Sequence, residues 1–175
     1  MTVPKYSHIE HERRFLVTDP QPTLCVGDHS NIRDCYIHGT RMRLRKVSPS
    51  DGRAPVFKLC KKYGHMTAVA EPIVNIYLSH SEYQLLTDLP SAVIEKRRYH
   101  HSIAGVRYAV DAFQGVLSGL ILTEVEAGDA PTLAALVPPP WAAREVTGDP
   151  WFHGGHLATI TAEMLHFYLQ AMSES

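Results

Sequence analysis

Two pairs of carboxylates in this sequence have a spacing that suits a metal site. Glu10 and Glu12 stand two residues apart near the start of the chain, and Glu124 and Glu126 repeat that spacing much later. Because side chains two residues apart on a β-strand point to the same face, each pair would project from one face of its strand. Carboxylate oxygens suit Mg²⁺ or Mn²⁺ better than zinc. The sequence therefore predicts a divalent-metal site that draws on both pairs.

Alternating cations accompany these carboxylates. The stretch RMRLR places Arg41, Arg43 and Arg45 on one strand face, and Arg14 follows Glu12 at the same spacing. The other charged residues on corresponding faces are Lys58, Lys62, Lys96, Arg98, Arg107 and Asp111. Nine cations and five carboxylates thus share one set of strand faces. Solvated outer faces are the simpler interpretation for any single strand, but such faces usually mix in Ser, Thr, Asn and Gln.

A closed antiparallel barrel with a polar interior explains these charged faces better. The apolar faces of the strands would then point outward and pack under helices. Cations gathered in such an interior need an anionic ligand, and arginine binds phosphate oxygens through two parallel hydrogen bonds. The pattern therefore predicts a polyphosphate bound together with a divalent metal.

Turn-rich stretches divide the chain into short segments typical of strands. We expect strands over 8–17, 34–47, 55–63, 70–79, 92–101, 106–113 and 119–127. A short helix is expected in SHSEYQLLTDLP, where Ser79 or Ser81 can cap it. A weaker helix is expected in PTLAALV and a long one over GGHLATITAEMLHFYLQAM. Many strands with a few helices predict an antiparallel α+β fold.

Composition bounds the class of protein. The 175 residues predict a single domain over residues 1–175, and a net charge of −1 gives no general attraction for nucleic acid or acidic membranes. Three cysteines without metal-type spacing suit a reducing cytosol, so we expect a cytoplasmic protein, as a monomer or homodimer. The histidine spacings lack the context of a zinc site, and the common glycine-rich nucleotide loops are absent.

With these residues in view, the chain resembles the CYTH, or triphosphate tunnel metalloenzyme, family. EHERR is similar to the family's E-x-E-x-K strand with Arg14 at the lysine, and RMRLR resembles its strand of alternating arginines. LCKKYG, EKRRY and VDAFQGVLSGLILTEVEAG resemble its L-T-x-K, K-x-R and D-x-F-x-G…L-x-x-E-x-E segments. REVTGDPWFHGGHLA resembles a closing E-V-T-x-D segment, so the resemblance spans about residues 8–160. The stretch VAEPIVNIYLS lacks the family's second E-x-E pair, and Glu71 and Asn75 are its nearest polar residues.

The resemblance implies an eight-stranded antiparallel β-barrel that forms a triphosphate tunnel, with flanking helices and a C-terminal helix. It implies a triphosphatase that uses Mg²⁺ or Mn²⁺ and acts on tripolyphosphate or a small organic triphosphate such as ATP or thiamine triphosphate. The metal would be held by Glu10, Glu12, Asp111, Glu124 and Glu126. The phosphates would be bound by Arg41, Arg43, Arg45, Lys58, Lys62, Lys96 and Arg98. Catalysis would depend on Glu10, Glu12, Arg14 and Lys62.

Two other functions remain open from the sequence. An adenylate cyclase would use the same residues, with the ribose hydroxyl of ATP as nucleophile in place of water. Trp141 or Trp151 could stack on its base, although packing within the fold is the simpler role for both. A non-catalytic polyphosphate- or nucleotide-binding module is suggested by the missing E-x-E pair and by Arg14 in place of lysine. Cyclic AMP formation would identify the first, and triphosphate binding without turnover the second.

Overall fold

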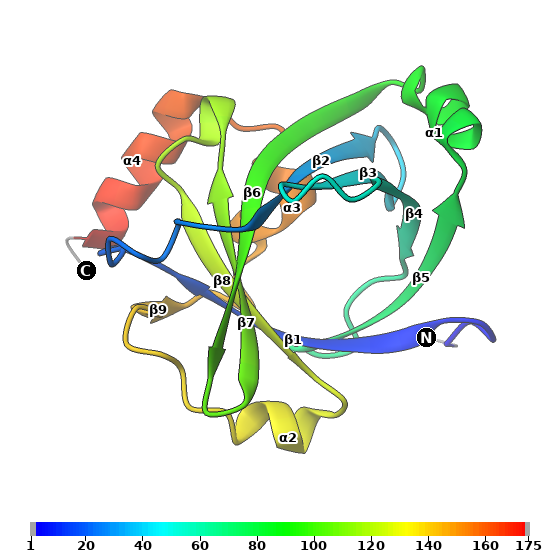
Figure 1. Ribbon diagram of the computed structural model, residues 1–175. Helices are drawn as coiled ribbons and strands as arrows, with labels where there is room; N and C mark the ends of the chain where they lie inside the picture. Colours follow the sequence, from blue (N-terminus) through cyan, green and yellow to red (C-terminus); the bar gives the residue numbers. More distant parts are fainter. Residues whose placement is uncertain (1–2, 174–175) are drawn as a thin grey trace.

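A closed β-barrel forms the centre of the computed structural model, which describes residues 3–173 (Figure 1). Eight antiparallel strands run round it in the order β1-β5-β4-β3-β2-β6-β7-β8, and β8 pairs with β1 again. The strands are β1 (His8–Leu16), β2 (His29–Ile37), β3 (Met42–Pro49), β4 (Val56–Lys62), β5 (Ala70–Leu78), β6 (Ser91–Ile103), β7 (Val106–Phe113) and β8 (Ile121–Ala127). This order confirms the expected eight-stranded antiparallel barrel.

Strand β1 closes the barrel. Its first half, His8–His11, pairs with β5, and His11–Leu16 pairs with β8 on the other edge. The Glu12 amide donates to the carbonyl of Val69, the residue just before β5 begins. The short strand β9 (Arg144–Glu145) pairs with the end of β1. The charged stretch of β1 therefore lies where three segments of the barrel wall meet.

One expected strand is two strands. Residues 34–47 belong to the hairpin of β2 and β3, which turns at Gly39. Gly39 has a φ of 69°, a conformation that favours glycine. The expectation of a continuous strand was wrong because the turn chemistry of HGTR was overlooked. The other six expected strands are present, with ends shifted by at most two residues.

Short helices and turns accompany the barrel. They are α1 (His80–Thr87), α2 (Ala130–Ala134), α3 (Gly154–Leu157) and α4 (Ala162–Ser173), with 3₁₀ turns η1 (Gly115–Leu117) and η2 (Pro150–Phe152). Ser79 caps α1, because its side chain accepts from the Glu82 amide while the Glu82 carboxylate accepts from the Ser79 amide. No helix among residues 3–173 has the length and apolar character needed to cross a membrane.

The long helix expected at the C-terminal end is interrupted. Residues 158–161 separate α3 from α4, and the Thr161 hydroxyl accepts from the Met164 amide at 3.3 Å to start α4. Three successive β-branched residues, Thr159 to Thr161, disfavour a continuous helix here. The expectation of one domain over residues 1–175 stays a prediction, and residues 1–2 and 174–175 lie outside the described part.

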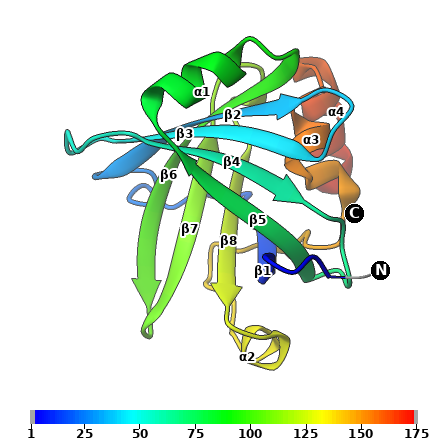
Figure 2. The same ribbon diagram turned by 90° about the vertical axis from the view of Figure 1, so that its right-hand side faces the viewer.

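Apolar clusters cover the outer wall of the barrel. Under α1, Tyr83 packs with Cys35, Leu44 and Phe57, and under α2, Leu133 packs with Phe15, Tyr108 and Val125. The two helices lie at the top and the bottom of both views (Figures 1 and 2). The segment before β2 contributes Leu24, which packs on Val17, Tyr99 and Val110. The expectation that apolar strand faces point outward and pack under helices is confirmed for these strands.

A fourth apolar cluster closes off part of the barrel interior. Ile94, Phe113 and Leu122 project inward and pack with Phe152 of η2 and Leu157 of α3. On β6 the inward-facing side chain changes from apolar Ile94 to charged Lys96 two residues later, and on β8 it changes from Leu122 to Glu124. The interior is therefore a charged cavity with an apolar floor.

Candidate active site

A cavity of about 490 Å³ occupies the barrel interior. It is lined by seven cations, Arg14, Arg41, Arg43, Arg45, Lys62, Lys96 and Arg98. It is also lined by six carboxylates, Glu10, Glu12, Asp34, Glu71, Glu124 and Glu126. The interior is thus nearly balanced in charge, in contrast to the cationic excess that strand parity predicted.

Two predicted site residues do not line the cavity. Lys58 lies on β4 beyond the end of the cavity, with its ammonium 4.9 Å from the ring centroid of Tyr77. Asp111 is fully buried behind the wall, where it accepts hydrogen bonds from neighbouring cations. Arg107, which shares the same parity, is exposed near the tip of the β6–β7 hairpin. Parity places a side chain on a face, but it does not say where along the strand the cavity ends.

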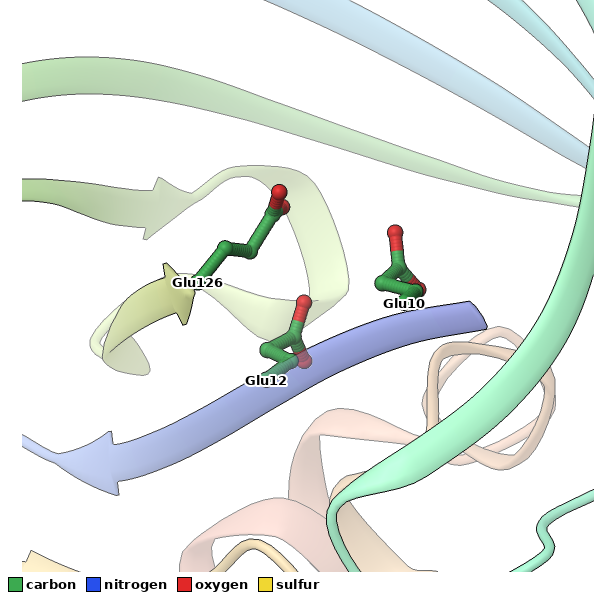
Figure 3. A group of neighbouring side chains, drawn as sticks. All are labelled: Glu10, Glu12 and Glu126. Atoms are coloured by element: carbon green, nitrogen blue, oxygen red, sulfur yellow. The ribbon is translucent and has the colours of Figure 1, made fainter. Parts of the chain in front are cut away.

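Three carboxylates gather at one place in this cavity. Glu10 and Glu12 project from β1 and Glu126 projects from β8 toward the same space (Figure 3). One ligand atom from each lies within 4.8 Å of the others. Glu12 faces Glu126 directly in the β1–β8 register, so the closure of the barrel creates this cluster.

The electrostatics of the cluster suit a cation. Burial raises the pKa of Glu12 to about 7, and the Glu124 carboxylate adds to the shift. Burial also raises the pKa of Glu126, with further contributions from Glu10 and Glu124. Burial and the neighbouring carboxylates both disfavour the ionised forms, and a bound cation would favour them. An all-oxygen donor set of this kind matches Mg²⁺ or Mn²⁺.

Lys62 joins the cluster to the β5 side of the barrel. Its Nζ donates to Glu10 at 3.1 Å and to Glu71 at 3.0 Å. Burial alone would lower the pKa of Lys62, but Glu10, Glu12 and Glu71 together raise it, so the ammonium stays charged. Glu71 also accepts from the Gly64 amide, and the next inward position on β5 is Ile73. The structure thus places one carboxylate, Glu71, at the strand where the second E-x-E pair is missing.

Arg14 connects the cluster to β8 and η2. Its guanidinium donates to Glu12 at 2.6 Å, to Glu124 at 3.0 Å and to the Phe152 carbonyl at 2.9 Å. Glu12 and Glu124 together outweigh the burial penalty and raise the pKa of Arg14. Arg14 therefore fixes the Glu12 side chain and connects β1 to η2.

A second group of charges lies on β6, β7 and β8. Arg98 donates two hydrogen bonds of 2.6 Å to Asp111 and one of 2.5 Å to Glu124, and Lys96 also donates to Asp111. Burial disfavours ionised Asp111, but Arg98 and Lys96 outweigh it and lower the pKa of its carboxyl. The structure therefore brings Asp111 and Glu124 to the cations, and both lie outside the Glu10–Glu12–Glu126 cluster.

Sequence reasoning missed Asp34. Its fully buried carboxylate accepts two hydrogen bonds of 2.6 Å from Arg45, and Arg43 Nε lies 3.7 Å away. The expected strand begins at residue 34, whereas Asp34 lies inside β2, so the parity of that segment did not predict it. Arg43 Nε is buried and has no hydrogen-bond partner among the described residues. Arg43 also lines the cavity, so its guanidinium is a candidate for contact with an anion there.

Loop residues complete the wall of the cavity. His65 and Ala68 come from the β4–β5 connection, and Thr147 and His153 come from the segment that follows β9. Tyr36 of β2 lies so close to Gly154 that a Cβ added there would fall 1.8 Å from its hydroxyl oxygen. Strand parity does not apply to loop residues, so it did not predict that His65 and His153 line the cavity.

Several known proteins resemble this chain in sequence. An inorganic triphosphatase of Acetivibrio thermocellus is 42% identical over 65 residues, which is 37% of this chain and 40% of that relative. An inorganic triphosphatase of Nitrosomonas europaea is 35% identical over 92 residues, covering 46% of this chain and 61% of that relative. The matches thus span less than two thirds of either relative. No protein-family model matches the chain.

Solved structures resemble the whole barrel. A crystal structure of an inorganic triphosphatase superposes with a TM-score of 0.57 and 26% identity over 86% of this chain and 95% of the other. A putative adenylate cyclase of Bacillus halodurans superposes with a TM-score of 0.50 and 18% identity, over 74% of this chain and 86% of the other. The second likeness concerns the fold alone.

Proposed function

We propose that this chain is a member of the CYTH or triphosphate tunnel metalloenzyme family, and that it hydrolyses a triphosphate inside its barrel with the help of a divalent metal. The observation that carries this proposal is the position of the Glu10–Glu12–Glu126 cluster in the same cavity as seven cations. A single cavity can thus bind a metal and the phosphates that the metal contacts.

The charge balance explains why metal and substrate would bind together. The cavity-lining cations and carboxylates nearly cancel, so a highly charged triphosphate gains little net attraction without further positive charge. A divalent cation at Glu10, Glu12 and Glu126 supplies that charge next to the arginines. We therefore expect tight triphosphate binding to depend on the metal.

The roles of the residues follow from their contacts. Glu10, Glu12 and Glu126 would hold Mg²⁺ or Mn²⁺, which when bound neutralises phosphate oxygens and orients a water for in-line attack. Arg43 lines the cavity and makes no hydrogen bond through Nε to the described residues, so it is the first candidate for binding a phosphate oxygen. The other cations proposed to bind phosphate are Arg41, Arg45, Lys62, Lys96 and Arg98. They stabilise the charge that moves toward the leaving oxygen during transfer.

The buried carboxylates hold these cations in place before substrate arrives. Asp34 orients Arg45, and Asp111 orients Arg98 and Lys96. Glu124 links Arg98 with Arg14. Such preorganisation lowers the cost of arranging charges at the moment of reaction. We therefore propose a positioning role for Asp34, Asp111 and Glu124, in place of the metal-ligand role expected for the last two.

Inorganic tripolyphosphate is the substrate we propose. Thirteen charged side chains line the cavity, and its apolar floor is filled by the fold's own residues. Trp151 stacks on Tyr168 with centroids 3.9 Å apart, and Trp141 packs against His101, so both tryptophans are engaged in the fold. The cytoplasmic location and the monomeric or homodimeric state expected from the sequence stay predictions.

Product analysis tests this function. Purified protein is incubated with tripolyphosphate, thiamine triphosphate or ATP, with Mg²⁺, Mn²⁺ or a chelator. Metal-dependent phosphate release, fastest from tripolyphosphate, is the expected result. Cyclic AMP from ATP would instead identify a cyclase, and tripolyphosphate binding without any product would identify a non-catalytic module.

A further inference from the structure

Two histidines from distant parts of the chain meet at the cavity wall. His65 lies on the β4–β5 connection and His153 between η2 and α3. Their ring centroids are 4.9 Å apart with the planes inclined by 36°, and both side chains line the cavity. The same two loops also meet at Ala68 and Gly148, since a Cβ on Gly148 would lie 3.5 Å from that of Ala68. The histidine pair therefore belongs to a seam between two loops that face the candidate active site.

The backbone fixes the position of His153. Its amide donates to the Pro150 carbonyl at 3.1 Å, and its own carbonyl accepts from the His156 and Leu157 amides at 2.9 Å. The preceding residue, Phe152, accepts a hydrogen bond from Arg14. The ring is therefore held beside the cation that anchors Glu12.

The ring nitrogens remain available to a ligand. Among residues 3–173, neither ring nitrogen of His153 makes a hydrogen bond, and Nε2 of His65 lies 3.8 Å from the Glu71 carboxylate, beyond hydrogen-bond distance. The charged groups facing the pair are Arg14, Lys62 and Glu71. Burial lowers the pKa of His153, and the neighbouring His65 and Arg14 lower it further. A neutral imidazole donates one N–H while its neighbouring cations attract an anion. Two such donors beside Lys62 and Arg14 match the needs of a phosphate group.

We propose that His65 and His153 form a phosphate-binding pair that contacts the triphosphate from the loop side of the cavity. This inference rests on the proposed function, because it assigns the pair to the same bound substrate. Each ring would donate one N–H to a phosphate oxygen, in addition to the cations supplied by the strands. A pair that only joins the two loops would leave substrate affinity unchanged when it is replaced by side chains that keep the loops in place.

Substrate affinity is the property that separates these two roles. Binding is measured by calorimetry with Mg²⁺ and an imido analogue of tripolyphosphate, whose bridging NH groups resist hydrolysis, and KM and kcat are measured separately with tripolyphosphate and Mg²⁺. Variants are His65→Ala, His153→Ala, the double alanine variant and the double glutamine variant, which keeps an N–H donor on each side. The matched control is His166→Ala, because His166 is exposed on α4.

The pair is expected to act on binding. Hydrogen bonds to a charged group contribute enough that the double alanine variant should weaken tripolyphosphate binding by about tenfold or more. KM should rise more than kcat falls, the double glutamine variant should recover most of the affinity, and His166→Ala should match wild type. The single variants keep the test valid if the double variant does not fold.

The outcomes separate this inference from the proposed function. If wild type hydrolyses tripolyphosphate and the folded alanine variants bind it with unchanged affinity, only the role proposed for the histidine pair would be overturned. If wild type binds tripolyphosphate without hydrolysing it, and the alanine variants bind it more weakly, the hydrolase function would be overturned and the pair would be supported as a binding element. Absence of tripolyphosphate binding by wild type would overturn both.

Discussion

Arg14 and Glu124 are direct partners across β1 and β8, and Nε of Arg14 donates to the Glu124 carboxylate at 3.0 Å. The remaining donors of the same guanidinium bind Glu12 and the Phe152 carbonyl. One planar side chain thus joins a proposed metal ligand, a positioning carboxylate and the loop that carries His153. A lysine at this position would keep the charge but has a single ammonium to serve three acceptors.

Arg14→Lys should therefore lower the free energy of unfolding by about 1–3 kcal/mol, because buried acceptors lose charged donors. Urea denaturation measures the change. Arg53→Lys is the control, since Arg53 pairs with Asp51 at the surface and its side chain is 77% exposed; no measurable change is expected there. Equal stability of Arg14→Lys and wild type would show that the three contacts of Arg14 add nothing to the fold.

Asp34→Asn should destabilise the protein in a pH-dependent way. Burial disfavours ionised Asp34, but Arg45 and Arg43 outweigh it and lower the pKa of Asp34 below its usual 3.8. A lowered pKa stabilises the fold above the unfolded-state value, and that stability is lost as pH falls through the folded-state value. Wild type should exceed Asp34→Asn by about 3–5 kcal/mol at neutral pH, since breaking a buried ion pair leaves the arginine uncompensated.

The difference between the two proteins should then shrink below about pH 4, where the unfolded-state carboxyl begins to bind a proton. Chemical denaturation at a series of pH values gives this comparison. Asp19→Asn, a change in an exposed turn, is the control and should follow wild type throughout. A difference that stays constant down to the acid limit would contradict the assigned pKa direction.

Strand parity predicted much of this site. It placed Glu10, Glu12 and Arg14 on one face of β1, and the structure brings all three to the cavity. Parity succeeded because a strand alternates its side chains whatever its neighbours are. The closure of the barrel then depended on register, which joins Glu12 to Glu126 and could not be derived from either strand alone.

Other parts of the site depended on features beyond parity. Lys58 has the right parity, but it lies past the cavity and contacts Tyr77 instead. Asp34 was missed because the turn at Gly39 was not used to divide the segment around it. His65 and His153 sit on loops whose meeting follows from tertiary packing rather than from local periodicity. Sequence patterns thus predicted the walls of the barrel better than the loops that border it.

Gly154→Ala should disturb the loop side of the cavity. A Cβ at residue 154 would fall 1.8 Å from the Tyr36 hydroxyl oxygen and 2.6 Å from the ring carbon that carries it, so the ring must move. Overpacking of this kind costs about 1–3 kcal/mol. Thermal denaturation should show a lower Tm, and tripolyphosphate turnover should fall with it.

Gly155→Ala is the matched control for that change. A Cβ there would meet the nearest Tyr36 atom at 3.8 Å, an ordinary contact, and alanine suits a helix better than glycine. The Tm of Gly155→Ala should therefore equal or slightly exceed that of wild type. If Gly154→Ala were as stable as Gly155→Ala, the close approach of Tyr36 to α3 would be refuted.

Mg²⁺ or Mn²⁺ should stabilise the fold through the carboxylate cluster. A ligand that binds only the folded state raises the free energy of unfolding by mass action, so Tm should rise with metal concentration. Glu126→Gln removes one carboxylate from the cluster and should reduce the Tm shift, while Glu163→Gln on exposed α4 should keep it. An undiminished shift in Glu126→Gln would place the metal elsewhere.

The most direct test of the proposed function is phosphate release from tripolyphosphate by wild type, Glu10→Gln and Glu126→Gln, each with Mg²⁺ and with chelator. Wild type should release phosphate only with the metal, and both variants should lose that turnover while their circular dichroism spectra stay unchanged. Glu163→Gln should behave as wild type. Metal-dependent hydrolysis at the wild-type rate by both cluster variants would contradict the account of Glu10, Glu12 and Glu126 as the metal-binding centre.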